Sequence, residues 1–265
     1  MKKLSLVVIA WISVVNVLAQ DTLTYQPNDK KAAKKQRINN MLRMEEEGEL
    51  IFNKQSAFGI KLATDGYGIS YEKGKFKTVR RTFLLQFELN EKKNPKDHKV
   101  AAAGYNGYNF NSVVVGKLNN FYSFKAAAGN QYLIGGKGNK NGVAVTALYS
   151  GGLSLGILKR YYVDVYNPRT NTDLKSTYPT IIDSGYIEYG SSGFFSGWNN
   201  VTLSPGLNAK LAMRFDYGRF NTTLTAIEVG VTGEYYFTKI PMLYLVPEQN
   251  FFFNAYLTIM FGKRK

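Results

Sequence analysis

The most constraining feature of this chain is an alternation of apolar and polar side chains along its second half, with charged residues on only one of the two faces. Leu211 and Phe215 belong to the apolar series, for example, whereas Lys210 and Arg214 belong to the polar series. Successive side chains of a β-strand point to opposite sides of the sheet, so a period of two predicts strands with one apolar and one polar face. The apolar faces must therefore pack against a second sheet or contact lipid.

The same alternation recurs from Ser56 to the C-terminus and predicts eight antiparallel strands. The strands are expected at residues 56–64, 67–73, 77–90, 119–135, 142–160, 201–217, 222–238 and 251–262. The count of eight depends on a turn at Asp65-Gly66, which divides an otherwise continuous first segment into two strands. Without this turn there would be an odd number of strands, which single-chain bacterial barrels avoid.

The predicted connections alternate in length along the chain. Short turns are expected at residues 72–77, 138–142 and 218–221, and long loops at residues 91–118, 161–200 and 239–250. Asn141-Gly142 in the second turn is a strong hairpin signal. Such alternation is typical of barrels that cross the bacterial outer membrane, with short turns on the periplasmic side and long loops outside.

The polar faces of the predicted strands carry balanced charge. If the apolar faces contact lipid, the opposite faces together supply five basic and five acidic residues: Lys61, Glu72, Arg80, Glu88, Lys125, Lys210, Arg214, Asp216, Glu228 and Glu234. The outer face of a soluble sandwich has no reason to match charges, whereas a narrow barrel interior must pair them because an unpaired buried charge is costly. We therefore expect these side chains to form an ion-paired network that fills the interior and prevents free passage of solutes.

The N-terminal part differs from the β-rich remainder. Residues 1–19 have two lysines, an apolar run and Ala19 before the expected cleavage point, which is the layout of a secretory signal peptide. An uncleaved membrane anchor is the alternative interpretation of this segment. Residues 20–54 are expected to form a periplasmic leader with a short helix, either solvated or docked, and residues 55–265 the β-domain. No later segment has the length and apolarity of a membrane-spanning helix, so insertion in a membrane would require a closed barrel.

The composition offers little for catalysis or cofactor binding. Cysteine is absent and His98 is the only histidine, so the sequence indicates neither a metal site nor a cofactor. We therefore assign no catalytic residues. Asp97, His98 and Ser112 could be imagined as the site of an envelope-lipid-modifying enzyme, although a lone loop histidine is more often polar surface. The net charge of +15 falls by two when Lys2 and Lys3 leave with the signal peptide. Export argues against nucleic acid as the partner of this basic chain. Anionic lipid nearby would explain the excess charge, and a set of lysines that is merely solvated is an equal alternative.

Several segments resemble a known class of proteins. The segments FNKQSAFGIKLATDGYGISYEKGK, GGLSLGILKRYYVDVYNP and FFFNAYLTIMFGKRK are similar to those of small outer-membrane β-barrel proteins of the Bacteroidota. The resemblance implies an all-β fold, an eight-stranded antiparallel transmembrane β-barrel with a short periplasmic N-terminal helix, located in the outer membrane. The resemblance implies fold and location rather than activity. Because a filled interior should not conduct solutes freely, we separately expect a non-enzymatic structural or interaction role in the cell envelope, carried by the loops or the leader, such as that of a subunit of a larger outer-membrane complex. A narrow transport pore, an envelope-lipid enzyme and a soluble β-sandwich stay open as alternatives.

The closing strand has a second expected role. Outer-membrane barrels usually end on an aromatic residue that the barrel-assembly machinery recognises. The residues expected to face lipid and to form this assembly signal are Phe251, Phe253, Leu257, Ile259 and Phe261, followed by a short basic periplasmic tail. The expected partners are therefore outer-membrane lipids and lipopolysaccharide, the assembly machinery during biogenesis, and an envelope protein that the sequence does not identify.

Overall fold

The computed structural model describes residues 52–101, 112–137, 142–218 and 222–265, together with helical positions 32, 33, 35, 36, 39 and 40. The six helical positions lie within the predicted leader and have exposed side chains. The predicted signal peptide lies outside the described residues. The chain divides into two compact units, Met1–Glu47 and Gly48–Lys265, and the second contains all the β-structure described below.

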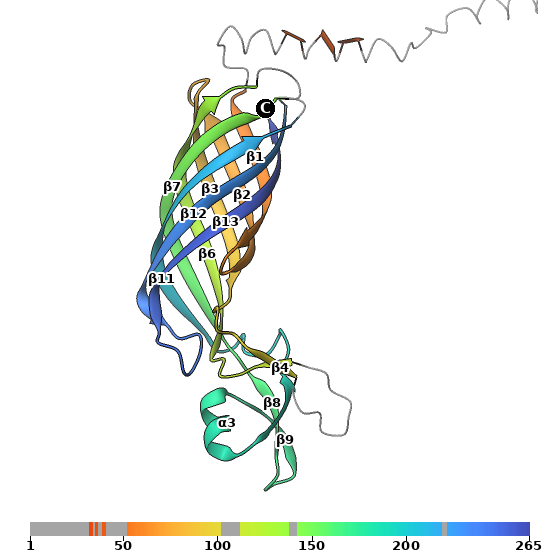
Figure 1. The fold of residues 1–265 in the computed structure, drawn as a ribbon, viewed down its shortest axis with the longest axis vertical. Helices are drawn as coiled ribbons and strands as arrows, with labels where there is room; N and C mark the ends of the chain where they lie inside the picture. Colours follow the sequence, from red (N-terminus) through yellow and green to blue (C-terminus); the bar gives the residue numbers. More distant parts are fainter. Residues whose placement is uncertain are drawn as a thin grey trace, which may run out of the picture. The chain divides into compact units, whose positions relative to one another are not determined.

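Eight long strands of the second unit close into an antiparallel barrel (Figure 1). They are β1 (Lys54–Ala63), β2 (Gly66–Phe76), β3 (Arg81–Lys92), β6 (Asn119–Gly135), β7 (Ala144–Arg160), β11 (Val201–Asp216), β12 (Thr223–Ile240) and β13 (Gln249–Arg264). Their closed order is β1-β13-β12-β11-β7-β6-β3-β2. The predicted fold class of an eight-stranded antiparallel barrel is confirmed, including the turn at Asp65-Gly66 that separates β1 from β2.

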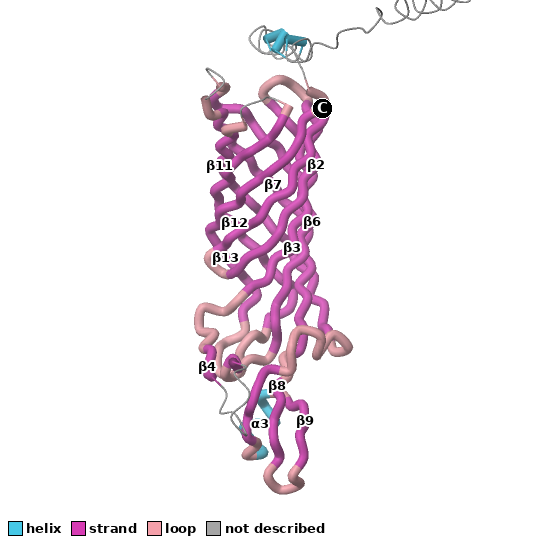
Figure 2. Tube along the Cα trace, turned by 90° about the vertical axis from the view of Figure 1, so that its right-hand side faces the viewer, coloured by secondary structure: helices cyan, strands magenta, loops and turns pink. Residues whose placement is uncertain are grey.

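The barrel is apolar outside and polar inside. On β13, Phe253 and Phe261 are 65% and 52% exposed, whereas the intervening Asn254 and Thr258 are each 3% exposed. The same alternation holds along β11, where every second residue from Ser204 to Asp216 is buried. Figure 2 shows the strands inclined to the barrel axis, as closure of a sheet requires. The period-two pattern of the sequence therefore corresponds to an inside and an outside rather than to two packed sheets.

The first short turn lies later in the chain than predicted. Strand β2 continues to Phe76, and the turn spans residues 77–80 rather than 72–77. The backbone N–H of Lys77 donates to the carbonyl of Arg81 (2.9 Å), and the N–H of Arg81 donates to the Thr78 hydroxyl (3.0 Å). These bonds place Arg80 in the turn with an exposed side chain, so its predicted position in the barrel interior is wrong.

The C-terminal residues do not form a free tail. Strand β13 extends through Arg264, and Gly262, Lys263 and Arg264 pair with the beginning of β1. The backbone N–H of Lys265 also donates to the carbonyl of Lys54 (2.8 Å). The predicted short basic tail is therefore wrong, because these residues complete the seam at which the last strand closes on the first.

The long connections contain secondary structure of their own. Strands β4 (Lys99–Ala101) and β5 (Ser112–Val114) pair with each other. Between β7 and β11, strands β8 (Val163–Asn167), β9 (Thr172–Ser176) and β10 (Ile187–Ser191) form a sheet in the order β10-β8-β9, accompanied by helix α3 (Tyr178–Ser184). Within the described ranges, no helix is both long and apolar enough to cross a membrane.

The three long connections join at one end of the barrel into what we call the loop cap, comprising the described parts of residues 93–118, 161–200 and 241–248 (Figure 1). Its core brings together β5, β8 and α3 through Val113, Val163, Val165, Tyr178 and Ile181. The N–H of Leu118 donates to the carbonyl of Met242 (2.9 Å), and the N–H of Tyr244 donates to the carbonyl of Gly116 (2.7 Å). The cap is therefore a small packed structure rather than three independent loops.

Candidate functional site in the barrel interior

Arg214 forms the first node of an ion-pair network in the interior. It is on β11 and completely buried. Its Nη1 and Nη2 donate to the two carboxylate oxygens of Glu72, both at 2.7 Å. Its Nε and Nη2 donate to Oε2 of Glu228 at 3.0 and 2.6 Å. Because charge-assisted, bidentate arginine–carboxylate bonds are among the strongest in proteins, Arg214 ties three strands of the wall together.

The two carboxylates that bind Arg214 have further donors. Glu72 accepts from the side-chain amides of Gln55 (2.9 Å) and Gln86 (3.1 Å). Glu228 accepts from the hydroxyl of Tyr256 at 2.7 Å. Besides the bonds from charged partners, Glu72 thus receives two hydrogen bonds and Glu228 one. Such additional donors lower the cost of keeping a charge buried.

Glu88 is the second node of the network and binds three lysines. The Nζ atoms of Lys61, Lys210 and Lys125 lie 2.8, 2.9 and 3.0 Å from its carboxylate oxygens. Lys210 also lies 3.4 Å from Glu228, so it links this node to the one around Arg214. The three lysines come from β1, β11 and β6, and Glu88 from β3, so this node spans the interior.

Glu234 forms the third node, toward the loop cap. Its Oε1 lies 2.9 Å from Nζ of Lys92 and 3.2 Å from Nζ of Lys125, and Lys125 is shared with Glu88. Lys92 also pairs with Asp65 at 2.7 Å. The three nodes therefore form one continuous series of ion pairs along the interior.

Asp216 lies apart from these nodes, near the short turns. It accepts from Nη2 of Arg264 (2.5 Å) and from Nζ of Lys137 (3.3 Å). Arg264 belongs to the end of β13 and Asp216 to the end of β11, so this pair connects two strand ends across the rim of the barrel.

The structure places nine of the ten predicted interior residues with buried side chains in ion pairs, and Arg80 is the exception. Sequence reasoning missed Lys92 because the strand was predicted to end at residue 90. Lys92 continues the phase of Glu88 and Asn90, so extending the alternation by one step would have found it. Other partners that were not predicted include Gln55, Asp65, Gln86, Ser123, Gln131, Lys137, Tyr236, Tyr256 and Arg264.

Apolar clusters lie on both sides of the charged network. Toward the cap, Phe121, Leu158, Tyr236, Ile240 and Met242 pack together, with the rings of Phe121 and Tyr236 5.3 Å apart. Toward the short turns, a second cluster contains Ala57, Leu224, Ala226 and Met260.

The barrel mouth below the cap also holds a buried cation. Nζ of Lys159 donates to the carbonyl oxygen of Phe194 and lies 4.6 and 5.3 Å from the ring centres of Phe194 and Trp198. These are cation–π distances, so the segment that contains both aromatic residues covers the mouth at this point.

Small voids lie between the charged side chains of the interior, and two of them are lined by described residues. One is lined by Lys125, Lys210 and Thr232 among others, and the second by Lys61, Asn90 and Glu234 among others. Each has a volume of about 10 Å³, roughly the space needed by one water molecule. Side chains therefore fill the interior at the level of the network, and the arrangement suits a plug rather than a channel.

The imagined catalytic group is not assembled in the cap. Asp97 pairs with Lys117 at 2.9 Å, and His98 has an exposed side chain. Ser112 pairs in the β4–β5 ladder with Ala101, three residues beyond His98. Among the described residues, no group of three or more histidine, aspartate or glutamate side chains is placed to hold a metal ion.

The fold and the interior together define a closed eight-stranded antiparallel β-barrel with an apolar exterior and an ion-paired interior. A comparison with solved structures finds similar chains over most of its length. Neisserial surface protein A matches with 10% identity and a TM-score of 0.40, covering 81% of this chain and 97% of that one. Ail, the attachment invasion locus protein of Yersinia pestis, matches with 9% identity and a TM-score of 0.38, covering 81% and 100%.

The N-terminal β-barrel domain of Pseudomonas aeruginosa OprF matches with 13% identity and a TM-score of 0.35, covering 80% of this chain and 98% of that one. No protein-family model matches the chain, and neither does any curated protein. At these identities, the assignment of the fold rests on the strand order and register of the chain itself.

Proposed function

We propose that this chain is a non-enzymatic integral outer-membrane β-barrel protein with a structural or interaction role in the cell envelope. The observation that supports this most is the inverted polarity of the barrel. Large apolar side chains such as Leu153, Leu211 and Phe253 are 62–67% exposed, while the charged side chains that face the interior from β7 and β11 are buried, namely Lys159, Lys210, Arg214 and Asp216. An exposed apolar surface that surrounds a barrel is costly in water and favourable in lipid.

The two ends of the barrel differ as they do in proteins of the proposed class. The C-terminus and the short turns lie at one end and the loop cap at the other (Figure 1). With the usual outer-membrane topology, the short-turn end faces the periplasm and the cap faces the exterior. Secretion through the predicted signal peptide would deliver the chain to this location.

The interaction role is assigned to the loop cap because the barrel interior is filled. The cap is packed but still exposes large apolar side chains, of which Phe195 (88%) and Leu245 (84%) are the most exposed. Exposed aromatic and aliphatic residues on a structured surface are typical of protein contact sites. We therefore propose that an envelope protein binds the cap and that the barrel anchors it, which would make the chain a subunit of a larger complex.

The first experiment tests membrane insertion. An isolated outer-membrane fraction is run on gels with and without boiling, and the purified protein is added to planar bilayers. We expect faster migration of the unboiled protein and no single-channel conductance. Extraction without detergent would contradict the proposal, and steady conductance would show that a pore is the better assignment.

The second experiment tests the interaction role. A tagged chain is purified from detergent-solubilised outer membrane, and co-purifying proteins are compared between the wild type and the double variant Phe195→Ser/Leu245→Ser. We expect a stoichiometric partner that the double variant loses and that the control Arg80→Ser, at the opposite end, retains. Absence of any such partner from the wild type would argue for a purely structural role.

A further inference from the structure

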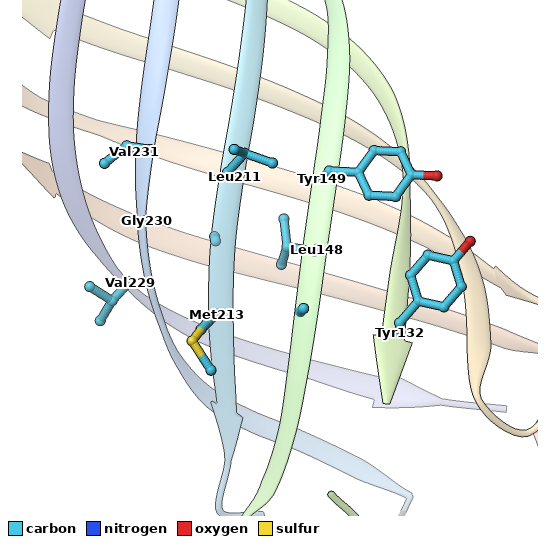
Figure 3. A pocket seen from close by; sticks show the side chains of 10 residues that line it. Tyr132, Leu148, Tyr149, Leu211, Met213, Val229, Gly230 and Val231 are labelled. Atoms are coloured by element: carbon cyan, nitrogen blue, oxygen red, sulfur yellow. The ribbon is translucent and has the colours of Figure 1, made fainter. Parts of the chain in front are cut away.

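An apolar groove lies on the outer face of the barrel, across strands β6, β7, β11 and β12 (Figure 3). Its volume is about 410 Å³, which lies within the range of roughly 300–1,000 Å³ found for small-molecule sites. Ala147 contributes only a methyl group to the lining, and Leu211, Met213 and Val229 border the groove beside it. The small side chain of Ala147 thus leaves open the space between these larger neighbours.

One end of the groove is polar. Figure 3 shows the rings of Tyr132 and Tyr149 side by side there, and their centroids are 6.2 Å apart with nearly parallel planes. The guanidinium of Arg81 lies 5.8 Å from the centre of the Tyr132 ring, and its Nε donates to Oδ1 of Asn130 (3.0 Å). Nδ2 of Asn130 donates in turn to the Tyr149 hydroxyl (3.3 Å). A connected set of polar groups therefore lies on the outer face, where apolar residues are otherwise the rule.

Arg81 has no acidic partner within the described part of the chain. The ion pairs found there involve other cations, and its side chain is exposed. Hydrogen bonding to Asn130 and contact with Tyr132 hold the guanidinium in position. The positive charge is therefore fixed but not neutralised, which leaves it available to an anionic ligand.

The strand register shows the direction of the groove. Arg81 pairs with Tyr132, Tyr132 with Ala147, Ala147 with Met213, and Met213 with Val229. Arg81 is the first residue of β3, whereas Val229 lies well inside β12, which begins at Thr223 near the same end of the barrel. The row therefore leads from the rim at the short turns toward the middle of the barrel.

We propose that this groove binds one anionic phospholipid, with an acyl chain along Ala147, Met213 and Val229 and the phosphate at Arg81. The inference rests on the proposed membrane location. A positive charge at the rim followed by an apolar groove that runs inward matches the order of headgroup and chain in a phospholipid. The tyrosines lie between the two, where amphipathic rings are favourable at a membrane interface.

Native mass spectrometry of the folded, detergent-solubilised protein tests the proposal. The protein is titrated separately with phosphatidylglycerol and with phosphatidylcholine. We expect one phosphatidylglycerol per chain, bound about fivefold more tightly than phosphatidylcholine, because a basic residue at an anionic membrane surface contributes about 1 kcal/mol. Arg81→Gln should abolish the preference and retain phosphatidylcholine binding. Ala147→Trp should fill the groove and weaken the binding of both lipids.

Two matched controls make the result specific. Lys73→Gln removes another outward cation that lies over a tyrosine, 6.0 Å from the Tyr71 ring, but outside the groove. Ala126→Trp adds a large side chain to the outer face of β6 at a position that does not line the groove. Both controls should bind phosphatidylglycerol like the wild type.

Equal affinity of the wild type for the two lipids would overturn the proposal. The same holds if Arg81→Gln and Lys73→Gln lose the same amount of affinity for phosphatidylglycerol. A dimer that forms in place of a lipid complex, and that Ala147→Trp disrupts, would assign the groove to a second copy of the chain. If Ala147→Trp does not fold, the comparison of Arg81→Gln with the wild type and with Lys73→Gln still tests the proposal. Heat-modifiable migration is measured first, so a barrel that inserts in membranes but shows no lipid preference refutes this inference and leaves the proposed function intact.

Discussion

Arg214→Met is the substitution for which the structure gives the most definite expectation. Arg214 donates five hydrogen bonds, two to Glu72, two to Glu228 and one to Gln131. Glu228 would keep Lys210 and the Tyr256 hydroxyl as partners, but Glu72 forms no other ion pair among the described residues. The substitution therefore leaves one carboxylate buried without a cation.

The expected loss follows from that single uncompensated charge. Breaking a buried ion pair by removing one partner costs about 3–5 kcal/mol, whereas replacing both charged partners with neutral groups is often nearly neutral. We therefore expect Arg214→Met to lower the free energy of unfolding by about 3–5 kcal/mol. Adding Glu72→Gln should restore most of the loss, because a neutral side chain at residue 72 can still bond to Gln55 and Gln86.

Urea unfolding of the protein in lipid vesicles, monitored by the gel mobility of the folded form, measures the free energy of unfolding of Arg214→Met and of the double variant. Arg80→Met is the matched control, because Arg80 is exposed in a turn and should change stability by less than about 0.5 kcal/mol. An Arg214→Met variant within about 1 kcal/mol of the wild type would refute the reasoning, since that is the range of an exposed ion pair. The reasoning would also be refuted if Arg214→Met/Glu72→Gln lowered the free energy of unfolding by the sum of what Arg214→Met and Glu72→Gln lose separately.

Three further predictions concern the plug, the cap and the closing strand. Phe121→Ala, at a fully buried ring of the apolar cluster below the cap, should cost about 3–5 kcal/mol in the same unfolding assay. Burial and a hydrogen bond to Glu188 (2.8 Å) raise the pKa of Tyr178 above its ordinary value of 10.0. The stability that this phenol gives the cap is therefore complete below pH 10 and is lost as the pH rises further. Protease cleavage of the cap should increase above pH 10 in the wild type, and Tyr178→Phe should abolish this dependence. Phe261→Ala should reduce the amount of heat-modifiable barrel in cells but not refolding from urea into vesicles, and equal effects in both assays would argue against a role in recognition by the assembly machinery.

The barrel itself could be predicted because its two faces differ so strongly in polarity. In β11, alternate residues from Ser204 to Asp216 are buried, as the alternation in the sequence indicated. The end of a strand is less well determined, because alternation does not stop where hydrogen bonding stops. Arg80 fits the alternation, since it lies two residues before the buried Thr82. It belongs, however, to the turn before β3, in which the Thr78 hydroxyl accepts from the N–H of Arg81. A threonine that accepts from the N–H three residues later is a local turn signal, and giving it weight would have excluded Arg80.

The secondary structure of the loop cap was not predicted, although helix α3 has signals at both ends. Pro179 lies in its first turn, and Gly185 follows its last residue with φ 68°, a left-handed conformation that favours glycine. Only Tyr178 and Ile181 of the helix are buried, so the apolar pattern is too short to identify it. The cap is stabilised by contacts between segments far apart in sequence, such as that between Val114 and Tyr161, which no local pattern encodes.

The pairing of charges in the interior follows from the width of the barrel. Strands β11 and β2 are four places apart in the closed order of eight, so Arg214 and Glu72 reach each other from opposite walls. The same holds for Lys92 on β3 and Glu234 on β12. Extended arginine, lysine and glutamate side chains can meet in this way only across a barrel of about eight strands, because the diameter grows with strand number. In a wider barrel the same residues would face water and would need no balance, so equal numbers of acidic and basic residues on the polar faces indicate a narrow, filled barrel even before the register is known.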